Sequence, residues 1–99
     1  MAELIVLYWR DIPSQVIVKS GRRSAKRELP KRFLEAIDAA AMRAGLAGAD
    51  AYLADWRRAE PQACGDDLEA EAEAAAARLD AAFDRAWLAA LVQAGGRQV

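Results

Sequence analysis

The stretch "LIVLYWRDIPSQVIVK" (residues 4–19) decides the fold. Residues 4–10 and 15–19 are rich in β-branched and aromatic side chains, which favour strands. Between them, "DIPS" offers an Asp side chain as a hydrogen-bond acceptor and a Pro with a fixed φ, two features of turns. The sequence therefore predicts a β-hairpin whose connection is residues 11–14.

Both faces of the first predicted strand are apolar, because alternation sorts its residues into two sets. The sets are Leu4, Val6 and Tyr8 on one face, and Ile5, Leu7 and Trp9 on the other. Such a strand is either covered on both sides, or covered on one side and used for contact on the other. We expect the second arrangement, in which one set faces the helices and the other stays exposed as a contact surface. The sequence does not decide which set is which.

A helix follows the hairpin. Pro30 suits its first turn, and apolar residues recur every four positions from Leu29 to Ala41, as on one helix face. Gly45 in "AGLAG" is suited to the left-handed conformation that ends many helices.

Residues 50–58, "DAYLADWRR", fit two structures. As a helix they place Tyr52 and Trp56 on one face, and as a strand they alternate these two residues with Leu53 and Asp55. Because an isolated hairpin is marginally stable in water, we expect a third antiparallel strand here. The helix stays open as the alternative.

A long helix completes the chain after a loop at residues 59–65. Asp66 or Asp67 caps its N-terminus, and its apolar stripe is Leu68, Ala72, Ala76, Leu79, Phe83, Trp87 and Leu91. A helix over residues 66–94 would be roughly 40 Å long, more than a small sheet covers, so one end overhangs, bends or meets a partner. We expect residues 94–99 to be a frayed tail.

These elements predict one α+β domain over residues 1–99. It contains a three-stranded antiparallel sheet, made of the hairpin and the third strand, with two helices on one face, the second of which is the long C-terminal helix. The longest bulky apolar run has six residues, far below the roughly 20 that cross a bilayer, and no basic residue precedes it as in a signal peptide. With a single Cys there is no internal disulfide, so we expect a cytoplasmic protein.

The composition argues against catalysis by the chain alone. It has no His, and therefore no imidazole base or metal ligand, and it lacks the glycine-rich phosphate-binding motifs. Cys64 precedes a helix start, but Asp66 and Asp67 oppose a thiolate there, so we expect an ordinary loop thiol. Carboxylates near residues 66–73 suit a solvated helix N-terminus better than a cation site. We predict no catalytic residue, no metal and no cofactor.

Positive charge gathers in "KSGRRSAKRELPKR" (residues 19–32), which holds seven basic side chains and one acidic one in a chain of formal net charge −1. Residues 1–34 hold eight basic and three acidic side chains, whereas residues 35–99 hold six and twelve. Such asymmetry can guide docking. The candidate binding residues are Arg10, Lys19, Arg22, Arg23, Lys26, Arg27, Lys31 and Arg32.

Three interpretations of this basic segment stay open. It is a solvated surface that balances the acidic helix, a site for an acidic protein surface or anionic ligand, or a site for nucleic acid. No aromatic residue interleaves the charges to stack on bases, which disfavours nucleic acid.

The order of these segments resembles the small bacterial virulence factor domain family, which also includes a domain of conserved virulence factor C. The resemblance covers the chain from Ala2 to about Leu91 and is most specific at "YWRDIP" (residues 8–13), "LPKRF" (residues 29–33) and "WRR" (residues 56–58). It implies no catalytic residue, since the name describes a phenotype of a larger staphylococcal protein in which a similar domain accompanies helical repeats. In alphaproteobacteria, the genes of free-standing members look like neighbours of genes for folate- and corrinoid-dependent methyl transfer. The resemblance therefore implies an accessory subunit in one-carbon metabolism.

We therefore predict a non-catalytic binding or accessory module that docks on an acidic protein surface through the basic segment, with Tyr8, Trp9 and Trp56 as aromatic anchors. A nucleic-acid-binding protein and a subunit in one-carbon metabolism are the alternatives. We expect no membrane partner, and self-association stays open.

Overall fold

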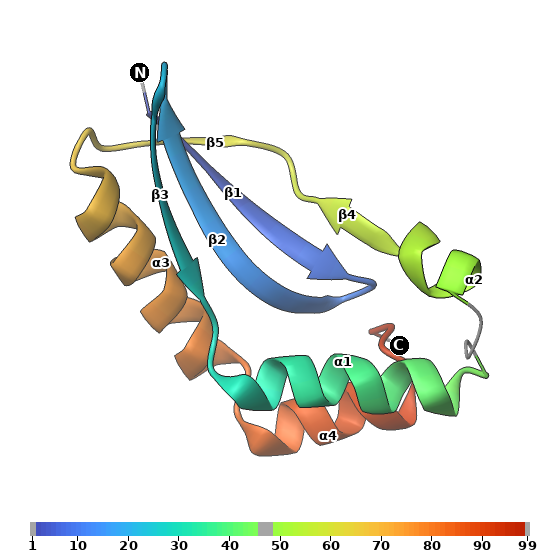
Figure 1. Ribbon diagram of the computed structural model, residues 1–99. Coiled ribbons are helices and arrows are strands. Elements are labelled where there is room, and N and C mark those ends of the chain that lie inside the picture. The colour runs from blue at the N-terminus through green and yellow to red at the C-terminus, as the bar shows by residue number, and fades with distance from the viewer. Residues whose placement is uncertain (1, 46–48, 99) are drawn as a thin grey trace.

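The structure, a computed structural model, describes residues 2–45 and 49–98, and Figure 1 shows how its elements are arranged. In chain order they are β1 (Ala2–Trp9), β2 (Ile12–Ser20), β3 (Arg23–Glu28), α1 (Lys31–Arg43), α2 (Ala49–Ala54), β4 (Trp56–Arg58), β5 (Gln62–Cys64), α3 (Leu68–Ala82) and α4 (Arg85–Gln93). The α+β class predicted from the sequence is confirmed.

The sheet is antiparallel and has five strands in the described residues, so the predicted three understate it. Its order is β3-β2-β1-β4, and β5 also pairs with β1. The β1–β2 hairpin is present, but its turn is Arg10–Asp11 rather than residues 11–14. Pro13 lies within β2, where the register shifts, and such an irregularity accommodates a residue without an N–H.

The third strand beside β2 comes from the basic segment and not from residues 50–58. β3 pairs with β2 along its whole length, from Arg23 opposite Ser20 to Glu28 opposite Gln15. Residues 50–58 divide between α2 and β4, so each alternative describes part of them. The predicted loop at residues 59–65 contains β5.

The predicted long C-terminal helix is broken into α3 and α4. Phe83 leaves helical geometry at φ −107° and ψ 73°, and the Asp84 side chain accepts a hydrogen bond from the Trp87 amide and so caps α4. The N-terminal cap of α3 is Asp67, one of the two predicted residues. Helix α1 is close to the prediction, and Gly45 after it has a φ of +76°.

Two apolar clusters form the core. In one, α3 packs against β1, β2 and β3 around Leu4, Val16 and Val18. In the other, α1 and α4 lie side by side across the end of the β1–β2 hairpin and enclose Trp9 and Phe33 (Figure 1).

The prediction of an exposed apolar strip on β1 is wrong. Leu4 and Val6 face α3, but in the opposite set Ile5 is 3% exposed and Trp9 is completely buried, so only Leu7 is half-buried. The strip does not form an open contact surface. None of the helices in the described residues is long and apolar enough to cross a bilayer, and a cytoplasmic location stays a prediction.

Candidate functional site

The eight candidate basic residues divide into two groups. Arg10, Arg27 and Arg32 make hydrogen bonds or ion pairs with other elements of the chain. The other five are exposed, and no carboxylate of the described residues lies within ion-pairing distance of them. These five are Lys19, Arg22, Arg23, Lys26 and Lys31.

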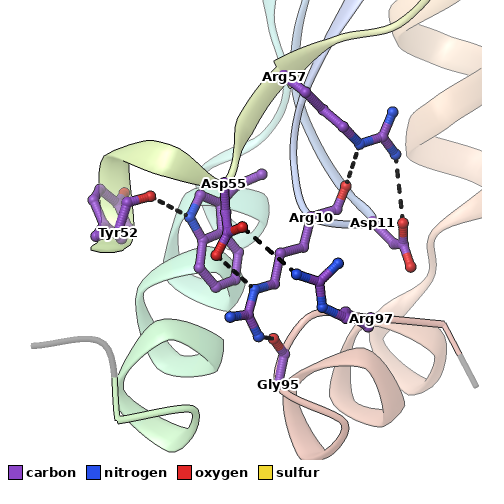
Figure 2. Close-up of polar contacts among 8 residues, drawn as sticks. Arg10, Asp11, Tyr52, Asp55, Arg57, Gly95 and Arg97 are labelled. Atoms are coloured by element: carbon purple, nitrogen blue, oxygen red, sulfur yellow. Dashed lines mark hydrogen bonds and ion pairs between the residues drawn. The ribbon is translucent and has the colours of Figure 1, made fainter. Parts of the chain in front are cut away.

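Arg10 is the most constrained member of the first group (Figure 2). It has a φ of 52°, and it is the only residue other than glycine with a positive φ in the described part of the chain. Its Nε donates to Asp55 at 3.0 Å, its Nη1 donates to the Gly95 carbonyl at 2.8 Å, and its guanidinium lies 5.0 Å from the centre of the Trp9 ring. A conformation this unfavourable persists only where neighbouring contacts hold it.

The C-terminal residues hold this turn from the other side. The Gly96 carbonyl accepts from the Asp11 amide at 2.8 Å, and Arg97 pairs with the second oxygen of Asp55 at 3.5 Å. Gly95 and Gly96 are buried, so residues 95–98 do not form the predicted frayed tail, and Val99 lies outside the described residues. The turn and the tail form one ion-pair network.

Arg27 and Arg32 connect helices to their surroundings. Arg27 donates to Glu69 in the first turn of α3 at 2.6 Å and to the Lys26 carbonyl at 2.9 Å. Arg32 donates to the Asp80 and Phe83 carbonyls at 2.9 and 3.1 Å. These hydrogen bonds satisfy carbonyl groups at the C-terminal end of α3. Both were predicted to bind a partner, but both contribute to the fold.

Four of the five exposed cations surround the β2–β3 turn. Gly21 has a φ of +60° and Arg22 does not have a positive φ, the pattern of a type II′ turn. Lys19 and Lys26 flank this turn on the two strands, and Arg23 begins β3. We call Lys19, Arg22, Arg23 and Lys26 the basic hairpin. Lys31 lies apart from it, at the start of α1.

The predicted aromatic anchors lie away from the basic hairpin, at the other end of β1. Trp9 is completely buried and donates its indole N–H to the Tyr52 carbonyl at 2.9 Å, so it is not available to a partner. Trp56 is half-buried against Tyr52. Tyr8 is half-buried beneath the Arg57 guanidinium, 4.6 Å from the centre of its ring.

A model of the virulence factor family matches residues 7–92, which is most of the chain and includes both turns. The chain belongs to the virulence factor family. The resemblance predicted from the sequence is thereby confirmed. No curated protein and no solved structure matches the chain.

Three carboxylates near the start of α3 have structural roles in this virulence factor domain. Asp67 accepts from the Ala70 amide at 3.1 Å, Glu69 binds Arg27, and Glu71 accepts from the Gly65 amide at 3.0 Å. Among the described residues, no three His, Cys, Asp or Glu side chains are placed to hold a metal ion.

Cys64 lies in β5, and partial burial raises the pKa of its thiol above the ordinary value. The negative charges of Glu71, Asp66 and Glu3 raise this pKa further. At neutral pH the thiol therefore stays protonated, which agrees with the ordinary thiol predicted from the sequence.

Proposed function

We propose that this virulence factor domain is a non-catalytic binding module that docks on an acidic protein surface through the basic hairpin. One observation carries the proposal: Lys19, Arg22, Arg23 and Lys26 are exposed, and no carboxylate of the described residues pairs with them. Since Arg10, Arg27 and Arg32 are held by the chain, the binding surface is narrower than the whole basic segment.

The strand pairing of the basic hairpin supports this function. Lys19, Arg23 and Lys26 lie on paired strands, Arg22 lies in the two-residue turn that joins them, and α3 packs on β3. Cations on a fixed frame lose less conformational entropy on binding than cations on a mobile loop. The arrangement favours charge-assisted contacts to carboxylates.

Nucleic acid fits the surface less well. Tyr8, Trp9 and Trp56 lie at the other end of β1, so no aromatic of the basic hairpin itself is available to stack on bases. An accessory role in one-carbon metabolism stays a prediction that rests on family resemblance alone.

A matched pair of variants tests the proposal. The hairpin variant carries Lys19→Gln, Arg22→Gln, Arg23→Gln and Lys26→Gln, and the control carries Lys31→Gln, Arg43→Gln, Arg58→Gln and Arg85→Gln, which are exposed cations elsewhere on the domain. Each variant loses four positive charges, so a general effect of net charge weakens polyglutamate binding equally in both. The probes are fluorescent polyglutamate, duplex DNA and single-stranded RNA, measured by anisotropy at about 50 and 200 mM salt.

We expect the hairpin variant alone to bind polyglutamate at least about tenfold more weakly than the wild-type domain. Equal weakening in both variants, or in neither, contradicts the proposal. Tighter binding of the wild-type domain to DNA or RNA than to polyglutamate replaces it with a nucleic-acid function.

A further inference from the structure

Helix α3 covers only part of the sheet face on which it lies. It packs mainly against β2 and β3. Beside it, β1 and β5 share with the flank of α3 a groove of about 270 Å³. The groove is lined by Leu4, Val6, Tyr8, Gln62, Ala75, Arg78, Leu79 and Ala82.

The register places the sheet side of this groove on one face. Leu4, Val6 and Tyr8 alternate along β1, while Gln62 lies directly opposite Leu4 and Arg57 directly opposite Tyr8. Side chains of directly opposed residues project to the same face. Val6 and Tyr8 are only half-buried, so their apolar surface is incompletely covered.

The helix side of the groove has the spacing of a packing surface. Ala75, Leu79 and Ala82 stand at positions i, i+4 and i+7 of α3, and so lie along one flank. Alanine at both ends lets a neighbouring backbone approach closely, and Leu79 offers a ridge between them. A second helix beside α3 would complete the layer over this half of the sheet.

The charge at the groove indicates what kind of helix would bind there. Arg78 is the only charged residue that lines the groove, it is exposed, and no carboxylate of the described residues pairs with it. Beside the groove, Arg57 lies over the Tyr8 ring, donates its Nε to the Arg10 carbonyl at 3.0 Å and pairs with Asp11 at 3.4 Å, so Arg78 is the cation left for an occupant. An occupant that combines an apolar stripe with carboxylates is complementary to this lining.

We propose that this groove binds an amphipathic α-helix from a partner protein, with the apolar side of that helix against Val6 and Leu79 and its acidic residues beside Arg78. The groove shares no residue with the basic hairpin, so this inference stands apart from the function proposed above. It adds a second contact surface and specifies the secondary structure that binds there.

The test uses two designed helical peptides of about 18 residues, long enough to cross the groove. Both carry a leucine stripe, flanked by Glu in one peptide and by Lys in the other. Each is titrated into the full-length ¹⁵N-labelled domain, and amide shifts are followed at Val6, Tyr8, Gln62 and Leu79.

We expect the Glu-flanked peptide to shift these amides and the Lys-flanked peptide to bind at least about tenfold more weakly. Arg78→Glu should weaken the Glu-flanked peptide by a similar factor. Ala82→Trp fills the groove and should abolish binding, whereas Ala77→Trp, an exposed alanine on the far side of α3, should leave it unchanged. The hairpin variant should bind the peptide as the wild-type domain does, which separates this result from the polyglutamate result.

Three outcomes overturn the inference. The groove amides fail to shift with the Glu-flanked peptide, or both peptides bind equally, or the shifts map instead to the exposed Leu34 and Met42 on α1. Shifts at the groove with a small aliphatic carboxylate such as octanoate, but none with the helix, would replace the partner helix with a small organic acid.

Discussion

The β1–β2 turn and the β2–β3 turn each contain one arginine, but Arg10 in the first is bound by other residues of the chain and Arg22 in the second is exposed. Arg10 and Gly21 each take the first position of a two-residue turn, with φ values of 52° and +60°. Arg10 adopts this conformation despite its side chain, and its backbone and side chain take part in four hydrogen bonds. Gly21 adopts it without strain, and Arg22 beside it is exposed.

The difference shows how an arginine stabilises the fold in one turn and stays available for binding in the other. The strain at Arg10 is offset by contacts to Asp55, Gly95 and Arg57, so its charge is committed to the chain. The β2–β3 turn needs no such contacts, because glycine meets its backbone requirement. The charge of Arg22 is therefore free to attract a partner.

The largest expected difference in the free energy of unfolding between the two turns comes from replacing one glycine at each turn by alanine. A Cβ at Gly96 would lie 2.6 Å from the buried Trp9 ring, at a φ of +91°, whereas a Cβ at Gly21 would meet nothing within 4 Å. Gly96→Ala combines overpacking with backbone strain and should lower the free energy of unfolding by about 3–5 kcal/mol, against about 1 kcal/mol for Gly21→Ala. Urea unfolding followed by Trp fluorescence measures both, and equal losses would show that the tail does not pack on the first turn.

Removing the two arginine side chains should have the next largest effect. Arg10→Ala breaks a largely buried ion pair and should lower the free energy of unfolding by about 2–4 kcal/mol, whereas Arg22→Ala should change it by at most about 0.5 kcal/mol. Arg10→Gly loses the same contacts but relieves the positive φ, so it should be about 1 kcal/mol more stable than Arg10→Ala. The account of strain at Arg10 fails if the glycine variant is the less stable of the two.

The smallest effect concerns Cys64. Its charged neighbours are acidic, whereas the residues of the basic hairpin are positively charged. Because burial and Glu71 raise its pKa, the midpoint of the pH–rate profile for reaction with iodoacetamide should lie above the ordinary thiol pKa of about 8.5. Glu71→Gln removes one negative charge and should shift the pH–rate profile to lower pH, giving a few-fold faster reaction at pH 8. Glu73→Gln, an exposed control on α3, should leave the profile in place, and an equal shift in both variants would mean that net charge, not local charge, controls this thiol.

Local features of the fold could be predicted from the sequence. The β1–β2 hairpin, α1 with Gly45 after it, and the Asp67 cap each depend on residues a few positions apart. β3 was missed because Ala25 is its only apolar residue, so an exposed charged edge strand shows no alternating pattern. The Ser20–Gly21 dipeptide was the signal for its turn. Asp84, three residues before Trp87, was the signal for the helix break.

The division of the basic residues could not be predicted in the same way. Arg10 and Gly95 are 85 positions apart, and Arg32 and Phe83 are 51 apart, so only the tertiary fold brings them together. Charge density in the sequence identified the segment that contains the basic hairpin. It could not separate the arginines that the chain uses from those that it leaves exposed.

Hydrogen exchange at arginine Nε–H groups tests this division most directly. In a ¹⁵N spectrum of the wild-type domain, the Nε–H of Arg10, which donates to Asp55, and that of Arg32, which is buried, should exchange at least about tenfold more slowly than those of Arg22 and Arg23. Exchange at Arg22 and Arg23 should match that of free arginine. Slow exchange at these two, equal to that of Arg10, would show that other groups of the chain bind the side chains of the basic hairpin and would contradict its proposed role as a binding surface.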